Sequence, residues 1–399
     1  MIKISDKSKC CACSACASIC PKRCIVMQED EEGFLYPKVD TSSCIDCDLC
    51  RKVCPILHQG APRLPLEVYA AKNKDEKIRM SSSSGGIFTQ LAEKVIDNGG
   101  VVFGARFNEK WEVVHDCVEN KCAIAAFRGS KYVQSRVGDN FAKVKQLLLS
   151  GRKVLFTGTP CQVAGLKKYL GKEYDNLFTV DVVCHGVPSP KVWRIYLREI
   201  ARKGGKNSVS WHSIHGRDAL VKGISFRDKR SGWKKFSFAL TLSEATADGE
   251  QNTVLLSSVF TENPYMNAFL SNLSLRPSCF SCIAKAGKSC SDIMLGDFWG
   301  IEDVLPGFDD DKGCSLVLVY SSKGKELLSK TIHEKWSVPY DDAVRENICV
   351  STSVSLQPNR ALFFKLIEKG KGLQNAWTVC SSTQMLHRIR RFIYRKIKI

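Results

Sequence analysis

Residues 10–21, Cys10-Cys-Ala-Cys-Ser-Ala-Cys-Ala-Ser-Ile-Cys-Pro21, have the spacing C-x2-C-x2-C-x3-C-P. Residues 44–55, Cys44-Ile-Asp-Cys-Asp-Leu-Cys-Arg-Lys-Val-Cys-Pro55, repeat that spacing, and each cysteine of the first run recurs 34 positions later. Ten of the 20 cysteines of the chain lie in this short stretch. The stretch is therefore an internal duplication with one shared chemistry.

This spacing is typical of the bacterial ferredoxin module that holds two 4Fe–4S clusters, in which the fourth cysteine of each run binds the other cluster. The predicted ligand sets are Cys10, Cys13, Cys16 and Cys54 for one cluster, and Cys44, Cys47, Cys50 and Cys20 for the other. Structural zinc sites use paired ligands rather than triplets with a distant fourth. A disulfide framework needs an oxidising compartment, and the chain begins Met-Ile-Lys without a secretory signal, so we expect a cytoplasmic protein. Cys11 and Cys24 fall outside the pattern and are interpreted as packing residues.

The whole chain has 399 residues, enough for two or three domains, and a formal net charge of +18. Three clusters, at about −2 each, would lower this charge to roughly +12. Such a surplus suits nucleic acid, an anionic membrane surface or an acidic carrier such as flavodoxin. The interleaved aromatics and basic stripe of nucleic-acid binders are lacking, so we expect no nucleic acid. The longest apolar runs are too short to cross a bilayer.

After a proline-bearing joint at 58–65, strands and helices alternate. Strands are predicted at 68–71, 101–103, 153–157 and 178–183, and helices start near 87, 160 and 190; turn-separated strands follow over 207–260. The rhythm favours an α/β fold with a mixed sheet and covering helices. The predicted division is a ferredoxin-like module (1–60), two parts of one larger α/β body (66–205 and 206–375) and a basic amphipathic tail (380–399).

Four further cysteines have a suggestive placement. Cys161 and Cys184 each follow a predicted strand, and Cys279 and Cys282 form a C-x2-C pair. If both strand ends share one edge of the sheet, the pair would complete a third four-thiolate site over it. Spacing alone leaves open that these are small buried apolar residues. The remaining cysteines are interpreted as core: Cys117, Cys122, Cys290, Cys314, Cys349 and Cys380.

Five ordered motifs over about 66–370 resemble the coenzyme F-420 hydrogenase/dehydrogenase beta-subunit family. They are Ser83-Ser-Gly-Gly-Ile-Phe88, Gly129-Ser-Lys-Tyr-Val-Gln-Ser135, Phe156-Thr-Gly-Thr-Pro-Cys-Gln162, Cys184-His-Gly-Val-Pro-Ser189, and Cys279-Phe-Ser-Cys282 with Ser291-Asp-Ile-Met-Leu-Gly-Asp-Phe-Trp-Gly300. The resemblance implies a flavoprotein body with FAD and one 4Fe–4S cluster, held by Cys161, Cys184, Cys279 and Cys282. Fusion to a two-cluster ferredoxin is seen in bacterial members found among surface-polysaccharide genes.

Three loops are the expected flavin contacts: Ser83, Ser84, Gly85 and Gly86 at a helix start, Ser130 with Lys131, and the turn of Thr157, Gly158 and Thr159. Lys131 is expected to pair with a phosphate or with the charge of a reduced flavin, and His185 is a candidate proton donor. The alternatives are ordinary capped turns and a structural histidine. For Asp297 and Trp299 we favour packing of their turn.

These features predict an iron–sulfur flavoprotein oxidoreductase that passes electrons from a ferredoxin or flavodoxin to FAD and an organic substrate. The alternative is an electron-transfer subunit without its own substrate site, serving a partner enzyme. Residues 385–399 form a basic amphipathic helix candidate for contact with a membrane surface or an acidic partner; the alternative is a helix packed on the body.

Overall fold

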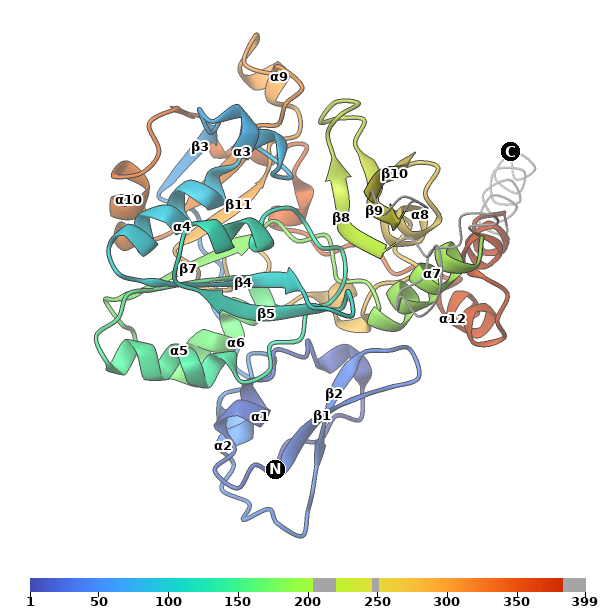
Figure 1. Cartoon of the computed structure of the whole chain (residues 1–399). Helices are drawn as coiled ribbons and strands as arrows, with labels where there is room; N and C mark the ends of the chain where they lie inside the picture. The colour runs from blue at the N-terminus through green and yellow to red at the C-terminus, as the bar shows by residue number, and fades with distance from the viewer. Residues whose placement is uncertain (204–219, 246–250, 383–399) are drawn as a thin grey trace, which may run out of the picture.

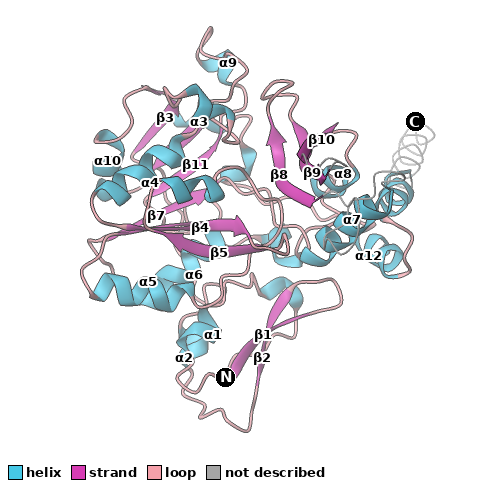
Figure 2. Cartoon of the chain, in the orientation of Figure 1, coloured by secondary structure: helices cyan, strands magenta, loops and turns pink. Residues whose placement is uncertain are grey.

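The computed structural model describes residues 1–203, 220–245 and 251–382 (Figure 1). A small N-terminal module lies beneath a large α/β body, next to helices α5 (Asn140–Leu149) and α6 (Pro160–Leu170). A second, smaller sheet and the helices around it form the other side of the body (Figure 2). The predicted tail helix over 385–399, and the part of the predicted strand region over 207–219, lie outside the described residues.

The module has two short helices and one hairpin, and its backbone repeats as its sequence does. Helix α1 (Ala15–Ile19) and helix α2 (Leu49–Lys52) each follow a left-handed residue, Ser14 at φ 67° and Asp48 at φ 61°. Two residues earlier in each run, Ala12 and Asp46 are also in the left-handed conformation. Small or polar side chains tolerate this conformation. Strands β1 (Ile25–Glu29) and β2 (Leu35–Val39) pair antiparallel, and a 3-10 turn η1 covers Lys7–Lys9.

The main sheet has eight strands in the order β13-β3-β12-β11-β7-β6-β4-β5. Its centre is parallel, because β4 pairs with β6, β6 with β7 and β7 with β11 in that sense, while both flanks are antiparallel. The strand bounds are β3 Glu67–Ala71, β4 Val101–Phe107, β5 Val113–Val118, β6 Val154–Gly158, β7 Leu177–Val182, β11 Ile293–Asp297, β12 Ser315–Val319 and β13 Lys335–Ser337. The predicted mixed α/β sheet is confirmed, and strands from both parts of the body share it.

Helices cover both faces of this sheet because its strands alternate. Phe103 and Phe156 pack against α5 and α6 on one face, whereas Val102 and Leu155 pack against α4 (Ile87–Asp97) on the other. Each such fully buried side chain contributes about 1.5–3 kcal/mol. Other helices of the body include α3 Glu76–Met80, η2 Cys122–Phe127, α9 Ile301–Val304, α10 Ser322–Ser329, α11 Tyr340–Val344 and η5 Ile348–Val350.

The second sheet is an antiparallel meander with an aromatic core. Its strands are β8 Leu220–Asp228, β9 Ser237–Ala245 and β10 Gln251–Val259, and the nearby helices are α7 Pro190–Lys203, α8 Pro264–Leu270, η4 Pro277–Ser281 and α12 Arg360–Glu368. The Trp193 ring of α7 lies 5.1 Å from both Phe226 and Tyr265. The pair with Tyr265 is edge-to-face and the pair with Phe226 is tilted, and such geometries favour one fixed arrangement.

The tip of the β1–β2 hairpin docks on the body. Gly33 packs so closely on α7 that an added Cβ would overlap Lys191 Cβ. Lys191 Nζ donates to the Glu31 carbonyl at 2.6 Å, and Arg360 Nη1 donates to Glu32 Oε1 at 2.9 Å. The module is therefore attached to the body through its hairpin as well as through the chain.

In the described part of the chain, no helix is long and apolar enough to cross a membrane.

Candidate functional site

Four cysteines of the module line one cavity, here called the inner cage: Cys10, Cys13, Cys16 and Cys54. Its other walls are mostly apolar, from Ile2, Ile4, Met27 and Ile56, and Cys11 also reaches it. A second cavity, the outer cage, is lined by Cys20, Cys44, Cys47 and Cys50, with Cys24 beside them. Each cage thus takes three cysteines from one run and the fourth from the other, which is the arrangement expected for two 4Fe–4S clusters.

The two cages differ in exposure. Burial raises the pKa of Cys10 and Cys13, and raises that of Cys16 to about 12. A bound iron would favour the deprotonated thiolates, because its positive charge stabilises them in a site from which water is excluded. In the outer cage, Cys47 is exposed and its neighbour Ile45 is 58% exposed. The outer cage therefore lies at the protein surface.

A third group of cysteines, here called the body cage, consists of Cys161, Cys184, Cys279 and Cys282. Cys161 lies in the first turn of α6 and Cys184 two residues beyond β7. Because β6 and β7 are parallel neighbours, the segments that follow them meet at one edge of the sheet. η4 then brings the C-x2-C pair.

The four thiols of the body cage lie within electrostatic reach of one another. Burial raises the pKa of Cys184 well above its usual range, and negative charge on Cys279, Cys161 or Cys282 would raise it further. Two polar groups approach the sulfurs: the Val187 amide donates to Cys279 Sγ at 3.4 Å, and Thr159 Oγ1 lies 3.3 Å from Cys161 Sγ, a contact in which either atom can be the donor. Such donors favour thiolate and cluster charge.

Two buried cations flank the body cage. Lys285 Nζ donates to the carbonyls of Cys184 and Cys349, both at 2.5 Å, and Arg276 Nε donates to the Cys10 carbonyl at 2.7 Å. Their side chains form no ion pair with a carboxylate within residues 1–203, 220–245 and 251–382. A buried charge without an opposite charge is costly. Four thiolates around a 4Fe–4S core would supply the missing negative charge, so the residues fit that group.

Across the same described ranges, no three His, Cys, Asp or Glu side chains converge closely enough to hold one metal ion. The ligands of a cubane bind four separate corners, so they surround a volume instead of meeting at a point.

The predicted flavin loops are partly brought together. The Ser130 amide donates to Ser83 Oγ at 2.6 Å, so the first two loops touch. Ser84 Oγ donates to the Cys314 carbonyl at 2.7 Å. Gly85 is required by close packing, since a Cβ there would overlap the Ala71 carbonyl oxygen. Gly86, at φ 82°, is the residue directly before α4. These contacts fix the loop; its role in flavin binding stays a prediction.

Lys131 makes only internal contacts among those the structure records. Its Nζ donates to the carbonyls of Ala126, Arg128 and Gly129 at 2.9, 2.8 and 3.2 Å, which caps the end of η2. Burial lowers its pKa to about 7, whereas the three carbonyls favour the charged ammonium. A pairing of Lys131 with phosphate or reduced flavin stays a prediction, and it would require some of these bonds to break.

The third predicted loop supports the start of α6. Thr157 Oγ1 donates to the Phe103 carbonyl at 2.8 Å, and Thr159 caps the helix together with Gln162. Gly158 packs against Gln162 and His115. His115, which the sequence did not single out, hydrogen-bonds Ser135, whose hydroxyl accepts from Gln162. Burial lowers the pKa of His115 to about 4, so this histidine is neutral.

His185 lies beside the body cage. Its Nε2 is 2.7 Å from Asn272 Oδ1, its Nδ1 is 3.9 Å from Cys349 Sγ, and Phe269 contacts its ring edge-on. Burial lowers its pKa. No recorded contact joins it to the three flavin loops within the described chain, and its role as a proton donor stays a prediction.

A buried ion pair that sequence reasoning missed lies next to the first loop. Arg227 Nη1 donates to Asp297 Oδ2 at 2.8 Å, and its Nη2 reaches the Ser83 carbonyl at 3.4 Å. Trp233 donates to Asp297 and stacks on Trp299 at 4.7 Å. Asp297 and Trp299 thus make packing contacts, and the purely packing role favoured from the sequence stays a prediction. In the sequence, the Gly-Asp-Phe-Trp-Gly motif indicated Asp297. No local pattern indicated Arg227, the partner of Asp297.

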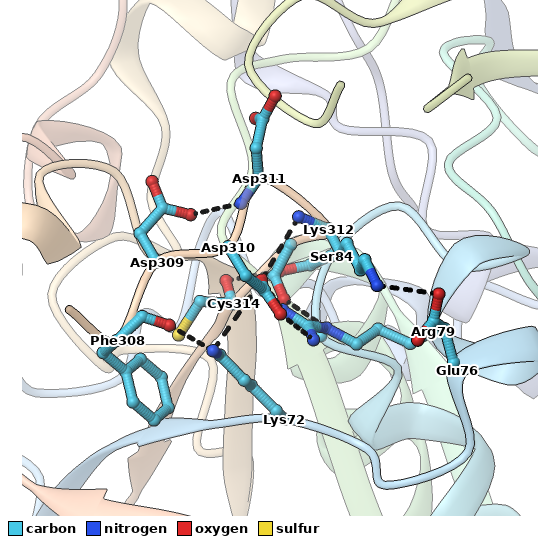
Figure 3. Close-up of polar contacts among 12 residues, drawn as sticks. Lys72, Glu76, Arg79, Ser84, Phe308, Asp309, Asp310, Asp311, Lys312 and Cys314 are labelled. Carbon is cyan, nitrogen blue, oxygen red and sulfur yellow. Dashed lines mark hydrogen bonds and ion pairs between the residues drawn. The ribbon is translucent and has the colours of Figure 1, made fainter. Parts of the chain in front are cut away.

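Other cations hold the loop 308–314 over the same segment (Figure 3). Arg79 forms a two-pronged ion pair with Asp310, and Lys229 Nζ donates to the carbonyls of Arg79, Ser84 and Lys312 at 2.6, 2.9 and 2.7 Å. The Ser81–Gly86 segment is therefore fixed from both sides.

Comparison with known proteins agrees with these observations. The family model described as "Coenzyme F420 hydrogenase/dehydrogenase, beta subunit N-term" matches residues 68–139, its counterpart for the C terminus of the same protein matches residues 151–338, and a "4Fe-4S dicluster domain" matches residues 9–56. No curated protein matches the chain. Among solved structures, a chain of the F420-reducing [NiFe] hydrogenase complex from Methanosarcina barkeri is 18% identical, with a TM-score of 0.42, covering 79% of this chain and 91% of that one. The chain therefore belongs to the coenzyme F420 hydrogenase/dehydrogenase beta-subunit family, as an iron–sulfur electron-transfer protein with an N-terminal 4Fe–4S dicluster domain.

Proposed function

We propose that the protein is an iron–sulfur flavoprotein oxidoreductase that takes electrons from a ferredoxin or flavodoxin and delivers them to an organic substrate. The observation that carries the proposal is the presence of three four-cysteine cages in one chain, two in the module and one in the body. When bound, 4Fe–4S clusters carry single electrons and a flavin accepts or donates two.

The residues of the chain have separate tasks in this assignment. The cysteines of the cages hold iron, and the apolar walls of the inner cage exclude water from it. Arg276 and Lys285 balance the negative charge of the body cage. The Ser83–Gly86 segment, held by Arg227 and Lys229, leads into α4, and the first backbone amides of that helix suit a pyrophosphate. Thr157–Thr159 follows the neighbouring strand β6.

A second candidate is an electron-transfer subunit that serves a partner enzyme and has no substrate site of its own. The observation that favours it is the match to models described as beta subunits of a hydrogenase or dehydrogenase. Size-exclusion chromatography of the protein from its native source separates the two: a stable complex with another oxidoreductase supports the subunit, whereas a free chain supports the enzyme.

The test of the main proposal is anaerobic purification with iron, sulfide and flavin quantified per chain. Three occupied cages and one flavin predict about twelve irons, about twelve sulfides and one FAD. About eight irons with no flavin would contradict both the third cluster and the flavoprotein assignment.

A further inference from the structure

We propose that electrons pass between the module and the body at a single junction, between the inner cage and the body cage, and that Arg276 is the positioning residue whose charge is shared by both. This inference rests on the proposed function and adds to it an order: outer cage, inner cage, body cage.

Arg276 lies at the junction between the inner cage and the body cage. The residue has no exposed surface. Nε donates to the Cys10 carbonyl at 2.7 Å, Nη2 to the Leu35 carbonyl at 2.9 Å, and Nη1 to Gln134 Oε1 at 3.0 Å. Its guanidinium also lies 4.3 Å from the centre of the Tyr36 ring. These hydrogen-bond acceptors are all neutral, so none of them balances the positive charge of Arg276. A negatively charged cluster in either cage would balance it.

Arg276 also contacts the body cage through its backbone. Its carbonyl accepts from the Cys279 amide at 3.0 Å, and η4, which carries Cys279, begins at the next residue. Among the contacts of Arg276 in the described part of the chain, none reaches a cysteine of the outer cage. Arg276 therefore stands between two cages and apart from the third.

The packing around Arg276 brings the two cages together. The Cys11 side chain belongs to the same buried cluster as Cys13, and Cys161 packs against this cluster. Gln134 Nε2 donates to the Cys11 carbonyl at 3.2 Å. Cys13 packs so closely on Gly165 of α6 that a Cβ added at residue 165 would lie 2.9 Å from Cys13 Sγ. One packed cluster thus joins a ligand of the inner cage to a ligand of the body cage.

With clusters held by both sets of cysteines, the one electron lost by the inner-cage cluster would be gained by the body-cage cluster. Arg276 stabilises the added negative charge on either side, because Coulomb attraction is strong where water is excluded. The surface position of the outer cage places the external donor at the other end.

The test uses the full chain, purified anaerobically, in redox titrations followed by electron paramagnetic resonance. Arg276→Met should lower the reduction potentials of two of the three clusters and leave the third unchanged, and Arg276→Lys should restore much of the shift. Arg360→Met is the matched control. Arg360 is also buried and joins the module to the body, but it pairs with the Glu32 carboxylate; its loss should change no potential.

The inference is overturned if Arg276→Met shifts no cluster, shifts all three equally, or shifts them no differently from Arg360→Met. If Arg276→Met does not fold, Cys11→Ala decides: its potentials should stay as in the wild type, while electron transfer from the module to the body, measured by rapid freeze-quench after photoreduction, slows severalfold. An unchanged rate overturns the inference. If the wild-type chain shows only two clusters by spin counting, the proposed function itself fails, which is a distinct result.

Discussion

The module and the body build the same kind of cage in opposite ways. Each module cage takes three ligands from one seven-residue stretch, so local turns do most of the work, with left-handed residues such as Ser14 and Asp48 at matching places. The body cage takes Cys161 and Cys184 from two neighbouring strand ends and Cys279 with Cys282 from a distant turn. Local sequence therefore determines the module cages, and the tertiary fold determines the body cage.

The largest effect is expected from removing half of the body cage. Cys279→Ser with Cys282→Ser should lower the iron content by about four per chain and leave the module clusters intact. Iron and sulfide analysis with electron paramagnetic resonance measures both. Cys290→Ser, a change just beyond the same turn, is the control and should keep all the iron. Loss of module iron in the double variant would mean that the two kinds of cage are not independent.

A large effect is also expected from the buried ion pair beneath the first predicted flavin loop. Asp297→Ala leaves the Arg227 side chain, which is 4% exposed, without its carboxylate, so the free energy of unfolding should fall by about 3–5 kcal/mol. Flavin retention should fall with it, because Arg227 also holds the Ser83 carbonyl. Denaturant unfolding and flavin release measure these changes. The control Glu302→Ala removes an exposed partner of Lys234 and should cost under about 1 kcal/mol.

A smaller effect is expected where the two regions touch. Gly165→Ala places a methyl group 2.6 Å from Cys13 Cβ, so it should destabilise the chain by about 1–3 kcal/mol although alanine is the better helix former. Limited proteolysis should also cut the joint at 58–65 faster. Lys168→Ala on the same helix is the control. A Gly165→Ala chain as stable as the wild type would show that the module does not pack on α6 as described.

The smallest effect concerns pH. The pKa of His115 is about 4 in the folded chain and about 6.5 when unfolded. Between these values the unfolded chain binds more protons, so this group makes the folded state less stable as the pH falls, by about 2 kcal/mol between pH 7 and pH 5. His115→Gln should flatten the pH dependence of denaturant unfolding over this range. His58→Gln, at an exposed position, should leave it unchanged.

Much of the fold could be read from the sequence, for a physical reason. The strands β3, β6 and β7 and the starts of α4 and α6 depend on local alternation, glycines and caps, and they lie close to where the sequence put them. Arg276, Arg227 and His115 could not be found in the same way. Each is a single polar residue whose partners lie far away in the chain, and only the packed structure shows that it is buried. Cys11 was interpreted as packing; it is buried, but it also lines the inner cage and belongs to the cluster against which Cys161 packs.

The docked hairpin has one more consequence. Gly33 packs on Lys191, and Glu32 accepts a hydrogen bond from Arg360. These contacts attach the module to the body at a second point, away from the cysteines. A module held only by a flexible linker would have to move to the body for each electron transfer. The rate of that transfer would depend on the length of the linker. Here the spacing between donor and acceptor is built in, so lengthening the joint at 58–65 by a few flexible residues should leave internal electron transfer nearly as fast as before.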